Sequence, residues 1–132
     1  MTGVLVGLRC RRSLRSGLEI AGSRDALKQL ASWIAAGGGS LSFDKPETSP
    51  APYERWLDRL AVTASQHSLV TIGIQDDTVR VVGDQTGLAT LAENIRIFAG
   101  DAGSPDDHLH IDYYPGHFFL AEESVPLVVA RR

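Results

Sequence analysis

The sequence predicts an α+β fold in a single domain, with a mainly antiparallel sheet and two helices. Three observations predict it. The chain has 132 residues, the length of one domain, and is long enough to bury a core. Short segments of alternating apolar and polar residues, typical of strands, surround two longer segments with helical spacing. The apolar fraction of 43% is close to that of an ordinary globular protein.

The first half of the chain, about residues 1–65, contains the first helix. Ser23 is suited to cap this helix, and apolar residues then recur at helical spacing. The glycines at 37–39 end the helix, because glycine readily adopts the left-handed conformation that follows a helix. A loop with prolines occupies residues 44–52. The predicted strands of this half lie at residues 4–9, 18–21, 41–43 and 57–64.

The second half, about residues 66–132, has a similar order of elements. Asp76 and Asp77 lie between two strand-like segments and predict a tight hairpin. Asp84 is suited to cap a second helix, which continues through Phe98 with apolar residues on one face. The predicted strands of this half lie at residues 69–75, 78–82, 108–113 and 125–130.

The two halves share a pattern that indicates a duplicated ββαββ unit. Residues 18–22, Leu-Glu-Ile-Ala-Gly, match residues 79–83, Val-Arg-Val-Val-Gly. The apolar residues of the two helices also coincide at one constant offset. One such unit cannot cover both faces of its own sheet, so the two copies are expected to pack together and complete a core.

The least ordinary residues lie in the second half, between residues 106 and 119. This segment contains three of the four histidines of the chain. His108, His110 and Asp112 alternate with apolar residues, so they are expected to project from one face of a strand. The Pro-Gly pair at 115–116 ends this strand, because proline lacks the N–H that a ladder needs.

The spacing of His108, His110 and Asp112 raises one alternative, a metal-dependent enzyme. Residues on the same face of a strand are roughly 6.5–7 Å apart, which is wide for three ligands of one ion. The sequence has no G-x-S-x-G, no H-E-x-x-H and no glycine-rich phosphate loop before a helix. Its single cysteine, Cys10, excludes an internal disulfide. We therefore expect no catalytic residue, no metal ligand and no cofactor.

Charge is distributed unevenly along the chain. The net charge of −3 argues against general affinity for nucleic acids. No lysine or arginine lies between Arg96 and Arg131, where acidic residues are interspersed with tyrosine and phenylalanine. Such a surface suits a basic protein partner, because aromatic side chains provide contact area and acidic groups provide selectivity. An ordinary solvated acidic loop is the alternative. The predicted binding residues are Asp106, Asp107, His108, His110, Asp112, Tyr114, His117, Phe118, Glu122 and Glu123.

The segment His-Leu-His-Ile-Asp-Tyr-Tyr-Pro-Gly-His at 108–117, followed by Ser-Val-Pro-Leu-Val-Val at 124–129, resembles the signature of a small actinobacterial family. This is the immunity protein 32 group of polymorphic toxin systems. The resemblance implies a cytoplasmic antidote that binds a cognate toxin domain and blocks its active site or the approach of its substrate. It also implies the motif positions His108, His110, Tyr114, Pro115, Gly116 and His117.

The leading hypothesis is therefore a non-catalytic immunity protein that neutralises a toxin by occlusion. We expect no nucleic-acid or membrane partner, and the apolar run at residues 1–8 is too short for a membrane span or a signal peptide. Two alternatives stay open. One is the metal-dependent enzyme at His108, His110 and Asp112; the other is a self-associating module, for example a homodimer formed through an exposed sheet edge.

Overall fold

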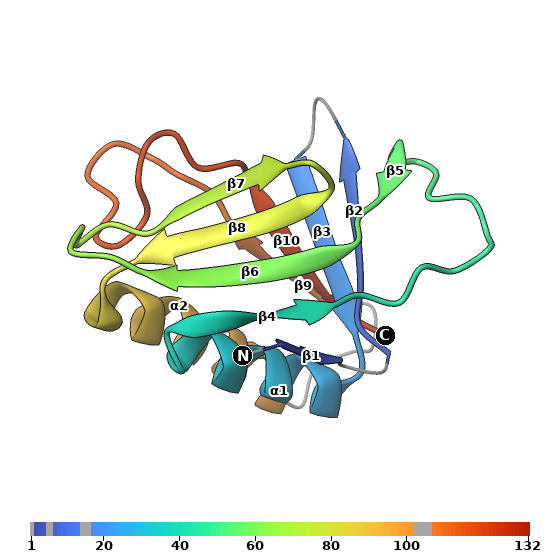
Figure 1. The fold of residues 1–132 in the computed structure, drawn as a ribbon, viewed down its shortest axis with the longest axis horizontal. Helices are drawn as coiled ribbons and strands as arrows, with labels where there is room; N and C mark the ends of the chain where they lie inside the picture. The colour runs from blue at the N-terminus through green and yellow to red at the C-terminus, as the bar shows by residue number, and fades with distance from the viewer. Residues whose placement is uncertain (1, 5–6, 14–16, 102–106) are drawn as a thin grey trace.

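The computed structural model describes residues 2–4, 7–13, 17–101 and 107–132. The strands of this part of the chain form two five-stranded sheets (Figure 1). Sheet A contains, in spatial order, β1 (Thr2–Val4), β4 (Gly38–Ser42), β6 (Arg59–Ala64), β8 (Thr78–Gly83) and β7 (Thr71–Gln75). Sheet B contains β5 (Arg55–Trp56), β2 (Arg9–Ser13), β3 (Gly17–Gly22), β10 (Leu127–Arg131) and β9 (His108–Ile111).

Each sheet combines hairpins from both halves of the chain. In sheet B, the β2–β3 hairpin of the first half joins β9 and β10 of the second half, and β3 lies parallel to β10. In sheet A, the β7–β8 hairpin of the second half joins β4 and β6, and β6 lies parallel to β8. The α+β class is confirmed, and five of the eight strand pairings in the described residues are antiparallel. The duplication of the halves stays a prediction.

Both helices begin where the capping residues predict. The Oγ of Ser23 accepts a hydrogen bond from the N–H of Ala26 at the start of α1 (Arg24–Ala35). The Oδ1 of Asp84 accepts one from the N–H of Gly87 at the start of α2 (Gln85–Gly100). These bonds satisfy backbone donors that the first turn of a helix leaves free. Neither helix in the described part of the chain combines the length and apolar character needed to cross a membrane.

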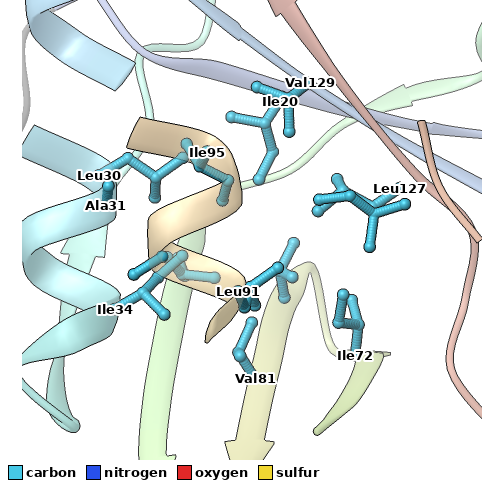
Figure 2. Close-up of a cluster of buried hydrophobic side chains, with 14 of the residues drawn as sticks. Ile20, Leu30, Ala31, Ile34, Ile72, Val81, Leu91, Ile95, Leu127 and Val129 are labelled. Carbon is cyan, nitrogen blue, oxygen red and sulfur yellow. The ribbon is translucent and has the colours of Figure 1, made fainter. Parts of the chain in front are cut away.

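The core lies where the helices meet the two sheets. The helices contact each other and lie along one side of the sheets (Figure 1). Figure 2 shows residues of both helices facing strand residues from both sheets. One core therefore joins the two helices and the two sheets. Its labelled members are Ile20, Leu30, Ala31, Ile34, Ile72, Val81, Leu91, Ile95, Leu127 and Val129.

One segment that was predicted as a single strand divides between the two sheets instead. The predicted strand at residues 4–9 is interrupted at Gly7, which has a φ of 86° and donates its N–H to Asp44 Oδ2 at 2.6 Å. Residues 5 and 6 of this prediction lie outside the described part. The predicted strand at residues 57–64 is a single strand, β6 of sheet A, which begins at Arg59; the short strand β5 of sheet B comes just before it. Alternation of apolar residues does not distinguish one sheet from the next.

Candidate functional site

The histidine-bearing strand is β9, which lies at the edge of sheet B. It pairs only with β10 within the described residues, with His108 opposite Ala130 and His110 opposite Val128. Both histidines are exposed and Ile111 is buried, as the alternation predicts. The strand ends at Ile111, so Asp112 follows the strand and is exposed in the loop.

The three residues of the metal alternative are not brought together as a metal site. The ring centroids of His108 and His110 are 6.5 Å apart, and the rings are tilted by 37°. Among the residues that the structure describes, no group of three or more His, Cys, Asp or Glu side chains is arranged to hold a metal ion.

A tight turn follows β9 and is organised by His117. The backbone N–H of His117 donates to the carbonyl oxygen of Tyr114 at 2.9 Å, and Gly116 has a φ of 84°. The Nδ1 atom of His117 accepts hydrogen bonds from the N–H of Phe119 at 3.2 Å and of Leu120 at 3.0 Å. In this arrangement Nδ1 carries no proton, because it acts as the acceptor. His117 is therefore a structural centre of the loop as well as a motif position.

Aromatic rings surround His117 and leave two large side chains exposed. The His117 ring centroid lies 4.6 Å from that of Tyr114, 5.6 Å from that of Phe118 and 4.6 Å from that of Phe119. Phe119 is buried, whereas Tyr114 is 54% exposed and Phe118 is 71% exposed. Phe119 thus anchors the loop in the core, whereas Tyr114 and Phe118 face solvent.

The loop then covers the free edge of sheet A beside β7. The N–H of Val70 donates to the carbonyl of Phe119, and the N–H of Ala121 donates to the carbonyl of Val70. The Ser124 hydroxyl accepts from the N–H of Ile72 at 3.1 Å and donates to the carbonyl of Val70 at 3.2 Å. These contacts fasten the loop after β9 to a segment about fifty residues earlier in the chain.

A groove of about 700 Å³ opens between these two segments. Its lining is acidic, aromatic and imidazole-bearing, and it includes no lysine or arginine among the described residues. The hydroxyl of Thr71 donates to Glu123 Oε1 at 3.1 Å, which orients that carboxylate. The lining residues are His67, Ser68, Leu69, Thr71, Tyr113, Gly116, His117, Ala121, Glu122 and Glu123.

The wall at residues 67–71 was not predicted as part of a site. It is held against α2, because the carbonyl of His67 accepts from the N–H of Asp84 and the carbonyl of Gly83 accepts from the N–H of Ser65. Leu69 in this wall is 40% exposed. A lone histidine and a lone leucine in a loop carry no local signal of a site. Only the long-range pairing of Val70 with Leu120 brings them opposite the predicted residues.

Of the predicted binding residues that the structure describes, His117, Glu122 and Glu123 line the groove, and six do not: Asp107, His108, His110, Asp112, Tyr114 and Phe118. Asp106 lies outside the described part of the chain. Asp107 Oδ2 is 3.4 Å from Nη2 of the buried Arg131, whose Nη1 also donates to the carbonyls of Phe98 and Asp101. Asp107 therefore contributes to holding a buried cation, because an unpaired buried charge is costly.

Arg11, one of the arginines near the N-terminus, also has structural partners. Arg11 Nε lies 2.8 Å from the buried Glu19, and its Nη1 donates to the carbonyls of Pro50 and Ala51 in the loop at residues 44–52. Cys10 is fully buried beside them. Burial, and then the charge of Glu19, raise the pKa of the Cys10 thiol, so this thiol is a poor nucleophile at neutral pH.

The C-terminal part of the chain, which contains the loop after β9, is similar in sequence to a known family. Residues 78–132 match the family model of Immunity protein 32. The match confirms the resemblance on which the sequence hypothesis drew, and it extends from β8 through α2, β9 and the groove loop to β10. It covers the region as a whole and does not single out the histidine motif. Comparison of the chain with curated proteins and with solved structures gives no match in either set.

The matched family model is described as a family of immunity proteins. Every predicted binding residue, from Asp106 to Glu123, lies within the matched region. The wall of the groove at residues 67–71 lies outside it.

Proposed function

We propose that this protein is an immunity protein that binds a cognate bacterial toxin domain in the cytoplasm and neutralises it by occlusion, without catalysis. The observation that carries the proposal is the match of residues 78–132 to Immunity protein 32. That region includes the loop with the most exposed aromatic side chain of the described residues, Phe118. Stoichiometric binding requires a contact surface rather than a reactive group.

The contact surface we propose is the aromatic–acidic surface, defined as Leu69, Tyr114, His117, Phe118, Glu122 and Glu123. Its apolar members are large and solvent-exposed, which is the chemistry of residues that dominate binding energy at interfaces. Its carboxylates favour a basic partner and disfavour acidic ones. His108, His110 and Asp112 lie exposed on and after β9 and are expected to extend this surface.

Occlusion follows from the charge of this surface. A toxin that acts on an anionic substrate such as a nucleic acid needs a basic cleft, and an acidic protein surface competes for that cleft. The aromatic side chains bury apolar surface against the toxin, which adds affinity to the attraction between opposite charges. The complex therefore blocks the approach of the substrate and leaves the chemistry of the toxin unchanged.

The direct test is co-expression with the toxin domain encoded beside the gene for this chain. The wild-type protein is expected to restore growth and to form an equimolar complex. The variant Tyr114→Ala/Phe118→Ala is expected to weaken the complex by at least about tenfold, the loss typical of hot-spot residues. Ile97→Ala is the matched control, because Ile97 is an exposed apolar residue of α2 that does not line the groove.

Two outcomes would overturn the proposal. One is wild-type protein that neither binds the toxin nor restores growth. The other is toxin whose loss of activity persists after the two proteins are separated, because that would indicate covalent modification. Light scattering of the free protein tests the self-association alternative, which requires a dimer in the absence of toxin.

A further inference from the structure

We infer that the groove between residues 67–71 and 113–123 binds an arginine side chain of the toxin, presented on a segment that also carries an apolar residue. This inference rests on the proposed function and adds the chemistry of the partner. The groove volume of about 700 Å³ lies within the range of about 300–1,000 Å³ of ligand-binding clefts. It therefore has room for a long side chain together with part of its backbone.

The charge of the groove selects a cation. Glu122 and Glu123 line it, and no lysine or arginine of the described lining opposes them. Thr71 fixes the Glu123 carboxylate through the 3.1 Å hydrogen bond, so one acceptor is already oriented. The Nδ1 atom of His117 already accepts from two backbone amides, so this ring nitrogen presents no donor that would compete with a cation for the carboxylates.

The aromatic lining favours arginine over lysine. Tyr113 and His117 contribute rings to the groove. A guanidinium is planar, stacks on rings and pairs with a carboxylate through two parallel bonds, whereas an ammonium is a compact and strongly hydrated charge. The exposed side chains of Leu69 on one wall and of Tyr114 and Phe118 beside the other suit an apolar residue next to the arginine.

Both walls of the groove are held in place before any partner binds. Val70 is fully buried and exchanges backbone hydrogen bonds with Phe119 and Ala121, which joins the two walls at their base. The wall at residues 67–71 is also fixed to the first turn of α2 through Asp84. A preformed site loses less conformational entropy on binding, so affinity is not consumed in ordering the loops.

The first experiment uses N-acetyl-arginine amide as a probe, with N-acetyl-citrulline amide as its uncharged equivalent. In 15N-labelled protein, arginine amide is expected to shift the amide signals of residues 67–71 and 121–123, and citrulline amide is expected to leave them in place. The variant Glu122→Gln/Glu123→Gln should weaken this binding by at least about fivefold, since it removes both charges and retains an acceptor for Thr71. Glu47→Gln, an exposed acid in the loop at residues 44–52, is the matched control.

Equal shifts of the groove amide signals with both probes, or shifts of the amide signals of exposed acidic residues throughout the protein, would overturn the inference. Binding measurements with the toxin itself distinguish a failure of the groove inference from a failure of the proposed function. If wild-type protein neutralises the toxin and Glu122→Gln/Glu123→Gln binds it equally well, the groove inference fails and the proposed function stands. If wild-type protein binds no toxin but the groove still selects arginine, the proposed function fails and the chemistry of the groove is supported.

Discussion

The Nδ1 atom of His117 accepts a hydrogen bond from the backbone N–H of Leu120, 3.0 Å away. A second bond from Phe119 reaches the same atom. Leu120 is fully buried and forms a parallel bridge with Val70, so the imidazole helps to set the position of the residue that joins the loop to sheet A. His117 was predicted as a binding residue from its place in the motif, and its hydrogen bonds give it a structural task in the same loop.

Replacing His117 by alanine is expected to destabilise the loop by about 1–2 kcal/mol, because two amides lose their acceptor. His117→Asn is the informative comparison, since the Asn Oδ1 can accept at nearly the same place while the ring is lost. We expect Asn to restore hydrogen-exchange protection of the Phe119 and Leu120 amides, which alanine does not. Equal exchange rates in the two variants would show that ring packing holds the loop.

Gly87→Ala is expected to destabilise the protein by about 1–3 kcal/mol in urea unfolding, the usual cost of overpacking. A Cβ at this position would lie 2.9 Å from Val70 Cγ2 and 3.0 Å from the carbonyl oxygen of Ser68. Alanine normally stabilises a helix by about 1 kcal/mol relative to glycine. A lower free energy of unfolding for Gly87→Ala would therefore indicate that the added Cβ is in close contact with its neighbours. Gly100→Ala is the control, because nothing lies within 4 Å of its Cβ. Stabilisation by both substitutions would contradict close packing at Gly87.

Gly116→Val is expected to destabilise the turn after β9 by about 1–2 kcal/mol, the cost of a left-handed backbone for a residue with a side chain. Gly116 has a φ of 84°, and nothing lies within 4 Å of the position of a Cβ. Backbone strain rather than a clash is therefore the cause. Gly116→Asn should cost less, since asparagine tolerates this conformation. Thermal unfolding of both variants checks the order, and equal midpoints for valine and wild type would refute it.

Cys10 is expected to resist alkylation by iodoacetamide in the native protein and to react in urea. Burial and the charge of Glu19 raise its pKa in the folded state above the value of about 8.5 in the unfolded chain. Its contribution to stability is then fully present below about pH 8.5 and decreases at higher pH, because only the unfolded state releases the proton. Cys10→Ala should therefore show a smaller loss of unfolding free energy between neutral pH and about pH 9.5. Alkylation of native protein at the unfolded rate would contradict this.

Sequence patterns predicted the features that depend on neighbouring residues. Ser23 and Asp84 cap their helices, and Asp76 and Asp77 both have positive φ angles in the predicted hairpin. Each of these signals acts within a few residues, so it can be read without knowing the rest of the fold.

The groove could not be predicted, because it depends on contacts between distant segments. His67 faces the C-terminal loop only because Val70 pairs with Leu120. The change of sheet at Gly7 likewise depends on its hydrogen bond to Asp44, 37 residues away. The assignment of Asp107 to a free acidic surface missed its neighbour Arg131, which approaches from β10. Local periodicity contains none of these pairings.

The interleaving of hairpins limits how this chain can be divided or exchanged. The family-matched segment supplies β8 to sheet A and β9 and β10 to sheet B. The other strands of both sheets come from earlier in the chain. Expressed alone, the family-matched segment would expose unpaired strand edges and half of a core, so it is not an autonomous folding unit. Recombination that replaces this segment by that of a related chain must preserve two parallel registers, Leu127 beside Leu18 and Thr78 beside Arg59. Any exchange of the C-terminal loop between related chains is therefore constrained by β3 and β6, which come from the first half of the chain.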